Sequence, residues 1–248
     1  SDDTRDIIDK KIKMVSCFID QFISIRVFNF KTVDYSSIRY TVFNITKMIR
    51  NKDINQLAEI LKGYINSMDL TLEGIDGFYL NQFTKRYMLH ILARMTHYIE
   101  EQSGINSNFA DYVNREQKNP YDIEHIWADD YTQGNHQQDF STEEEFKQFR
   151  NRFGGLLILP KDKNRSLQDM EYSKKVIKYD SENLLARTLN KNCYSNNPLF
   201  LRFMNETQLP FKPYDQFDKK ALIERQSLYK EICKKIWDVN KIDLLANS

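Results

Sequence analysis

The sequence predicts a mainly α-helical protein with one small embedded pair of strands, an α+β arrangement. The 248 residues include only 7 Gly and 5 Pro, which leaves few tight turns. Apolar residues recur at helical spacing near both ends of the chain, whereas two apolar runs in the middle are too short for exposed helices. A hydrophobic fraction of 41% with 13% aromatic residues is sufficient for a packed core.

The first part of the chain is expected to be helical. Residues 5–103 carry apolar residues at helical spacing in three successive segments. Residues 105–120 are polar and rich in Asn, and they predict a linker. We therefore expect a helical connector, or arm, over residues 1–115 and a second domain over residues 116–248, with its strand-containing core at about 119–180.

The second domain is expected to mix short strands with helices. Leu156–Leu159 is short and entirely apolar, which favours a buried strand, and a turn then leads into a short helix over Asp162–Ser166. Asp218–Trp237 predicts a long amphipathic helix with Leu222, Ile223, Leu228, Ile232 and Ile236 turned inward. His136 lies in a polar loop, where exposure to solvent is favoured over service as a metal ligand.

Three polar residues flank the two apolar runs. Glu124 and His125 lie on the first run, and Asn164 follows the second. A carboxylate and an amide are oxygen ligands suited to Mg²⁺, and a histidine can take a proton from water, so the set predicts a one-metal phosphodiesterase. Neighbours on a strand point to opposite faces, so Glu124 and His125 serve one site only if the strand ends, twists or bulges there.

With their surroundings, these segments resemble the HNH, or ββα-metal, endonucleases. Glu-His-Ile is followed, after a loop, by Phe-Gly-Gly-Leu-Leu-Ile-Leu-Pro-Lys-Asp-Lys-Asn from Phe153 to Asn164. The chain is most similar to the HxxP-motif branch found at the C-terminus of GmrSD-type modification-dependent restriction proteins. The similarity covers roughly residues 119–240, about half the chain. It implies a mainly α fold with a small embedded ββα-metal (HNH) module.

The resemblance assigns roles to individual residues. His125 matches the general base, and Glu124 and Asn164 match metal ligands and members of the catalytic set, with Asp122 as a further candidate ligand. Asn164 also fits a second role, because Asn is a favoured helix N-cap. The implied cofactor is one Mg²⁺ or Mn²⁺ ion. Ala128 stands at the proline of the usual His-x-x-Pro motif.

Two residues are expected to support the loop that carries the histidine. Gly155 stands where the family usually has a middle asparagine, and Asn151, four residues earlier, is expected to substitute for it. Basic residues gather around the motif although the net charge is only +1, and a local surplus of this kind suits a phosphate backbone. The expected DNA-backbone residues are Lys147, Arg150, Arg152, Lys161, Lys163, Arg165 and Lys175.

The sequence therefore predicts a metal-dependent DNA endonuclease domain of a restriction or phage-defence protein acting on modified DNA. Two alternatives stay open: a catalytically inactive HNH-like domain for DNA binding or assembly, and a plain helical interaction module. The expected partners are double-stranded DNA, possibly modified, and an N-terminal nucleotide-hydrolysing domain, whose Asp-Gly-Gln-Gln-Arg motif is not in this sequence. An oligomer is possible. Three cysteines without a Cys-x-x-Cys pair and the lack of a long apolar run predict a cytoplasmic protein without a membrane anchor.

Overall fold

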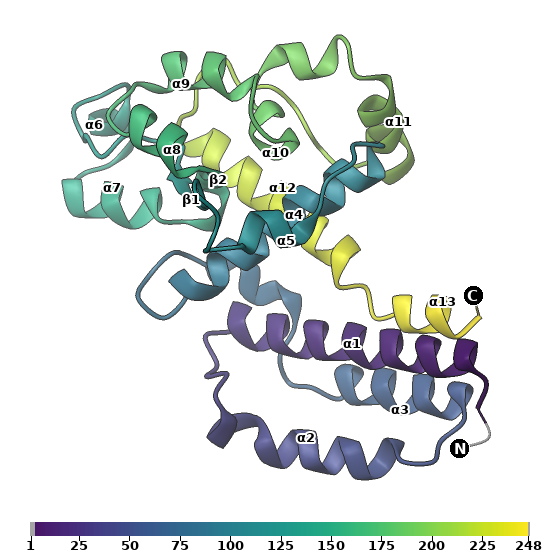
Figure 1. The fold of residues 1–248 in the computed structure, drawn as a ribbon. Helices are drawn as coiled ribbons and strands as arrows, with labels where there is room; N and C mark the ends of the chain where they lie inside the picture. The colour runs from purple at the N-terminus through teal and green to yellow at the C-terminus, as the bar shows by residue number, and fades with distance from the viewer. Residues whose placement is uncertain (1–2, 248) are drawn as a thin grey trace. The chain divides into compact units, whose positions relative to one another are not determined.

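The computed structural model describes residues 3–247, which form two compact units (Figure 1). Unit 1 contains the residues up to Ile75 and those from Lys234 onward, and unit 2 is Asp76–Cys233. The predicted class is confirmed, because helices dominate and the described residues contain one two-stranded sheet. The expected boundary after residue 115 falls inside unit 2. Within residues 3–247, no helix is long and apolar enough to cross a membrane.

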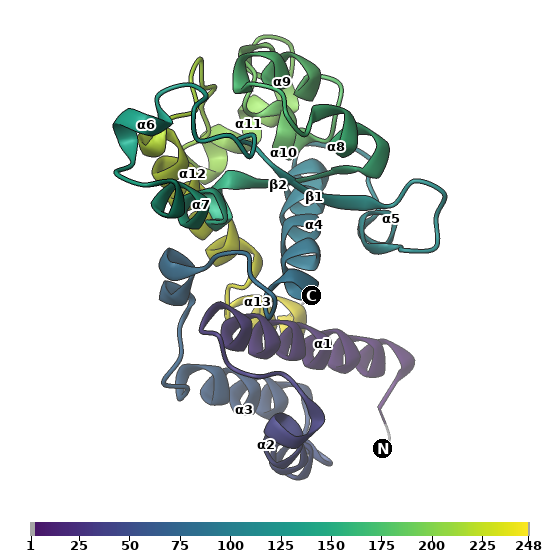
Figure 2. The same cartoon turned by 90° about the vertical axis from the view of Figure 1, so that its left-hand side faces the viewer.

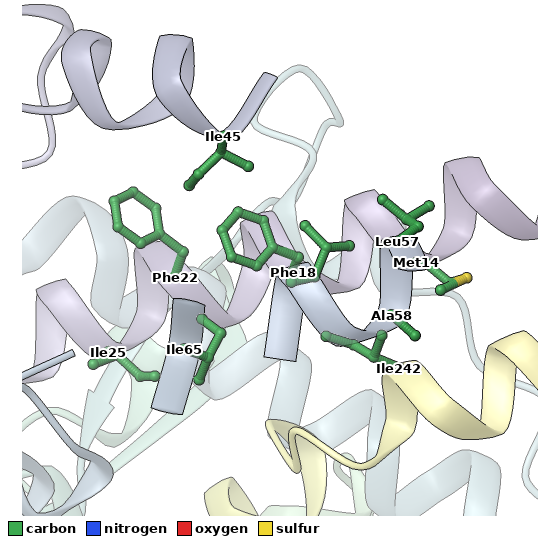
Figure 3. Packing of buried hydrophobic residues seen from close by; sticks show 10 residues of the cluster. Met14, Phe18, Phe22, Ile25, Ile45, Leu57, Ala58, Ile65 and Ile242 are labelled. Carbon is green, nitrogen blue, oxygen red and sulfur yellow. The ribbon is translucent and has the colours of Figure 1, made fainter. Parts of the chain in front are cut away.

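Unit 1 is a small group of helices around an apolar core (Figure 3). Asp34 and Asp53 each begin a helix with a capping box, in which the aspartate accepts from a backbone N–H of the first turn. The shared core includes Phe18, Phe22 and Leu61. The helices are α1 (Arg5–Phe28), α2 (Tyr35–Ile49), α3 (Ile54–Asn66) and α13 (Lys241–Asn247).

Unit 2 surrounds a β-hairpin with helices. The strands are β1 (Tyr121–His125) and β2 (Leu156–Pro160), which pair antiparallel with Tyr121 opposite Pro160 and His125 opposite Leu156. Residues 156–159 are fully buried, so the predicted buried strand is confirmed. The predicted short helix is present as α8 (Lys161–Leu167), but it follows β2 directly, without the expected turn. Figure 2 shows the hairpin with α8 above it and α4 (Lys85–Gln102) below it, and both helices contact the strands.

The remaining elements of unit 2 enclose the hairpin. Two features differ from the sequence prediction: a short helix, α5, forms within the expected linker, and Ile223 of α12 is 46% exposed because the helix presents only part of its apolar surface to the core. These elements are α5 (Phe109–Val113), α6 (His136–Asp139), α7 (Glu143–Arg150), η2 (Phe153–Gly155), α9 (Tyr172–Tyr179), α10 (Leu184–Arg187), η3 (Lys191–Tyr194), α11 (Pro198–Thr207) and α12 (Lys219–Ile236), while η1 (Leu72–Gly77) spans the boundary of the two units.

A close backbone approach fixes the segment just before β2. A Cβ atom on Gly154 would lie 2.5 Å from the backbone nitrogen of Gln226 in α12. The Gly154 N–H donates to the side-chain oxygen Oε1 of Gln226, at 2.6 Å. Only glycine lets α12 pack this closely against the chain entering the hairpin. The second glycine of the Phe-Gly-Gly motif, Gly155, lies next to it.

Candidate active site

His125 ends β1, and one ring nitrogen is held by a neighbouring amide. Its Nε2 lies 3.0 Å from Oδ1 of Asn151, at the C-terminal end of α7. Because an amide oxygen only accepts, Nε2 carries the proton and Nδ1 is left with its lone pair. Asn151 therefore contacts the histidine directly, as expected for a residue that supports the loop carrying it.

The surroundings of His125 favour its neutral form. Burial, reinforced by the positive charge of Arg150, lowers the pKa of His125 to about 3, while the hydrogen bond to Asn151 acts in the opposite direction. The imidazole is therefore uncharged at neutral pH. A neutral ring with a free Nδ1 is the form that can accept a proton from water.

The loop after His125 is held by backbone contacts to Gly155. The N–H of Ile126 donates to the Gly155 carbonyl, at 2.9 Å. A Cβ atom on Gly155 would lie 3.2 Å from both the Arg150 carbonyl and a methyl carbon of Leu222, which is a tight fit. An asparagine at this position would crowd α12, which gives a physical reason for the departure from the motif.

Asn164 joins α8 to β1. Its Nδ2 donates to the backbone carbonyl of Ile123, at 2.8 Å, and no partner of its Oδ1 is found among residues 3–247. Pro160 occupies the N-cap position of α8, and Asn164 is the fourth residue of the helix. The alternative role of Asn164 as an N-cap is therefore wrong. Its side-chain oxygen remains as a possible metal donor.

Glu124 points away from His125 into the interior. Its Oε1 accepts from Nζ of Lys175, at 2.7 Å, and from the hydroxyl of Tyr179, at 2.9 Å. Glu124 is 2% exposed and Lys175 is 1% exposed. Burial raises the pKa of Glu124, and the ammonium of Lys175 opposes this shift. The strand alternation thus separates Glu124 from His125, as it does for any regular strand.

Two sequence predictions change because of this ion pair. Lys175 was expected to bind the DNA backbone, but its ammonium is enclosed, and it donates a second hydrogen bond to the His125 carbonyl, at 2.7 Å. Glu124 was expected to be a metal ligand beside Asn164, but in this structure its carboxylate is paired within the core and lies outside the pocket that Asn164 lines.

The pocket in front of His125 has a volume of about 770 Å³. His125, Asn164 and Asp122 line it together, so three of the four predicted catalytic and metal-binding residues converge there. Among residues 3–247 there is no group of three His, Cys, Asp or Glu side chains arranged to hold a metal ion. A hydrated Mg²⁺ needs only one or two protein oxygens, and the Asn164 amide and the Asp122 carboxylate provide hard oxygen donors of that kind.

The predicted DNA-backbone residues divide between the pocket and other surroundings. Lys161 and Arg165 line the pocket, and Lys163 is exposed on the same helix. Arg150 is turned inward, where its Nε donates to the carbonyls of Trp127 and Ala128, each at 3.2 Å, an arrangement that does not favour its predicted role as a phosphate ligand. Two further predicted DNA-backbone residues have partners close by in the sequence: Lys147 pairs with Glu143, and Arg152 stacks on Phe149.

Sequence reasoning missed cationic residues that line the pocket from earlier segments of the chain. Lys85 and Arg86 begin α4, and Arg115 lies between α5 and β1. These residues precede His125 by up to 40 positions, in a region interpreted as a connector. No local motif marks them. Only the packing of α4 against the hairpin reveals their place.

His136 is not the exposed loop residue that the sequence predicted. It is 7% exposed and lies among aromatic rings, with ring centroids 4.7 Å from Trp127 and 4.6 Å from Phe146. Its Nδ1 is buried and has no hydrogen-bond partner in the described part of the chain. His136 therefore belongs to an aromatic cluster in the core. The polar residues that surround it in the chain did not indicate this burial.

Comparison with known proteins identifies one family to which the chain is similar. A family model, that of the C-terminal domain of GmrSD restriction endonucleases, matches residues 67–232. The matched range includes β1, β2 and α8, together with α4. No curated protein and no solved structure gives a significant match to the chain.

Proposed function

We propose, from the premise that this chain belongs to the family of GmrSD restriction endonuclease C-terminal domains, that unit 2 is a metal-dependent DNA endonuclease of the HNH type. Family membership supports a nuclease domain of a restriction system, and restriction serves defence against phage. The observation that carries the finer proposal is the meeting of a neutral histidine, a free amide oxygen and a carboxylate in one cationic pocket.

In the proposed reaction, His125 is the general base. Nδ1 takes a proton from a water molecule, and the resulting hydroxide attacks the phosphorus of the scissile phosphodiester. The bond from phosphorus to the leaving oxygen breaks, and that oxygen is protonated by solvent. A phosphate anion entering the pocket raises the pKa of His125 from its low resting value, because a nearby negative charge stabilises the imidazolium.

The proposed metal is a single Mg²⁺ or Mn²⁺. When bound, it supplies positive charge to the phosphate and the leaving oxygen. The side chains available to hold it are Asn164, through Oδ1, and Asp122, through its carboxylate. Asp122 also forms an ion pair with Arg115 at 2.9 Å, which fixes its position at the edge of β1.

The remaining parts of the proposal rest on the resemblance. The substrate is double-stranded DNA, possibly modified, and an N-terminal nucleotide-hydrolysing domain, an oligomer and a cytoplasmic setting belong to the same proposal. The second candidate function is an HNH-like domain that binds DNA without cutting it. The enclosure of Glu124 by Lys175 favours this alternative, because it removes one expected metal ligand.

Nicking of a supercoiled plasmid by the full chain separates the two functions. We expect nicking with Mg²⁺ or Mn²⁺ and none with EDTA. We also expect the rate to fall roughly 10²–10⁴-fold in His125→Ala, the range for loss of a general base. Cleavage in EDTA, or an unchanged rate in His125→Ala, contradicts the proposal. DNA binding without cleavage under any divalent ion supports the inactive alternative.

A further inference from the structure

The cationic residues of the pocket come from two separate segments. Lys161 and Arg165 belong to α8, beside Asn164. Lys85 and Arg86 belong to the first turn of α4, a helix that lies on the other side of the hairpin from α8 (Figure 2). Arg115 lies between α5 and β1. The pocket is therefore lined by positive charge from both sides, and only the α8 side lies in the motif.

Most of this charge is not neutralised by the protein. Among residues 3–247, no carboxylate partner is found for Lys85, Lys161 or Arg165. Arg86 stacks on the ring of Tyr87, with its guanidinium carbon 4.5 Å from the ring centroid, which orients it without neutralising it. Within the described part of the chain, Asp122 supplies the one carboxylate that lines the pocket, and it pairs with Arg115.

We propose that Lys85 and Arg86 form a second phosphate-binding subsite, which holds the DNA backbone next to the scissile phosphate. The inference rests on the proposed function, since the α8 residues Lys161 and Arg165 then hold the phosphate that faces His125. The strand runs across the pocket between the two sets of cations.

Size and chemistry favour a polymer backbone as the ligand. The volume of about 770 Å³ far exceeds the space of one phosphate group and leaves room for flanking nucleotides. Lys85 and Arg86 are exposed, as phosphate ligands on a DNA-binding surface must be. Leu80 and Leu89 lie beside them in the pocket lining and provide an apolar surface for the sugars.

The test measures DNA affinity of the full chain in EDTA across a salt series, so that no cleavage is needed. We expect Lys85→Gln/Arg86→Gln to lower the slope of log K against log salt by about two units, because each phosphate contact contributes roughly one. The matched control is Lys178→Gln/Lys191→Gln, which removes the same charge from exposed residues of unit 2 outside the pocket. We expect the control to leave the slope within about half a unit of wild type.

Two outcomes overturn the inference. One is an equal change of slope in the α4 variant and the control, which means that Lys85 and Arg86 act only through net charge. The other is a normal slope in the α4 variant with impaired competition by a free mononucleotide, which makes the pocket a nucleotide site. Neither outcome bears on His125-dependent nicking, so failure of this inference is distinguishable from failure of the proposed function.

Discussion

Replacing Lys175 by methionine tests the buried ion pair beneath β1. In the wild-type protein, Nζ of Lys175 lies 2.7 Å from Oε1 of Glu124 and 2.7 Å from the His125 carbonyl. Methionine keeps most of the volume but leaves the carboxylate with the Tyr179 hydroxyl alone. Removing one partner of a buried pair costs about 3–5 kcal/mol, because the other charge stays uncompensated in the core.

A double-mutant cycle isolates the pair from the packing of the individual side chains. We expect Lys175→Met to lower the free energy of unfolding by about 3–5 kcal/mol, measured by urea denaturation at pH 7. Glu124→Gln/Lys175→Met removes both charges and should recover a large part of that loss. The control is Lys174→Met, an exposed neighbour on α9, which should change stability by less than about 0.5 kcal/mol.

The pH dependence of the same variant has a definite sign. Without Lys175, the pKa of the buried Glu124 rises further above its unfolded value, so the folded state retains a proton that the unfolded chain releases. The stability deficit of Lys175→Met is therefore smallest below the ordinary glutamate pKa and grows as pH rises. A deficit like that of Lys174→Met, or a double variant no more stable than Lys175→Met, refutes the buried-pair account.

Two further predictions concern packing around the hairpin. Burial lowers the pKa of His136 below its unfolded value, so the contribution of the neutral ring to stability is lost as pH falls below about 6.5. His136→Phe should be at least as stable as wild type at pH 7, and its advantage in the free energy of unfolding, measured by urea denaturation, should widen towards pH 5. Parallel pH profiles of the two proteins would contradict this. Gly154→Ala should cost about 1–3 kcal/mol or more, because its Cβ would meet the Gln226 backbone at 2.5 Å. Gly63 lies in α3, where no atom would lie within 4 Å of a new Cβ, so Gly63→Ala should instead raise the free energy of unfolding by about 0.5–1 kcal/mol. A similar loss of stability in both variants would refute the contact argument.

The sequence predicted the hairpin and its helix well because their signals are local. The apolar run of Leu156–Leu159 is short and continuous, and it is a buried strand. The polar residues after Pro160 form the short helix α8, which carries Asn164. Each of these features depends on residues within a few positions of one another.

The composition of the site was harder to predict because it depends on long-range packing. The alternation of a strand predicts that Glu124 and His125 diverge, but their true partners, Lys175 and Asn151, lie 51 and 26 residues away. The DNA-facing charge was assigned by proximity to the motif. That criterion included the buried Lys175 and omitted Lys85, which reaches the pocket only because α4 packs on the hairpin.

We propose as the functional centre the pocket shared by His125, Asn164 and Asp122, with Glu124 outside it and paired with Lys175 in the interior. Calorimetric titration with Mn²⁺ tests it most directly, on wild type, Asn164→Ala and Glu124→Gln/Lys175→Met. We predict that Asn164→Ala weakens Mn²⁺ binding by about tenfold or more, whereas the double variant, folded and without the buried pair, binds within about twofold of wild type. Lost binding in the double variant together with unchanged binding in Asn164→Ala would contradict the account and place the metal on Glu124.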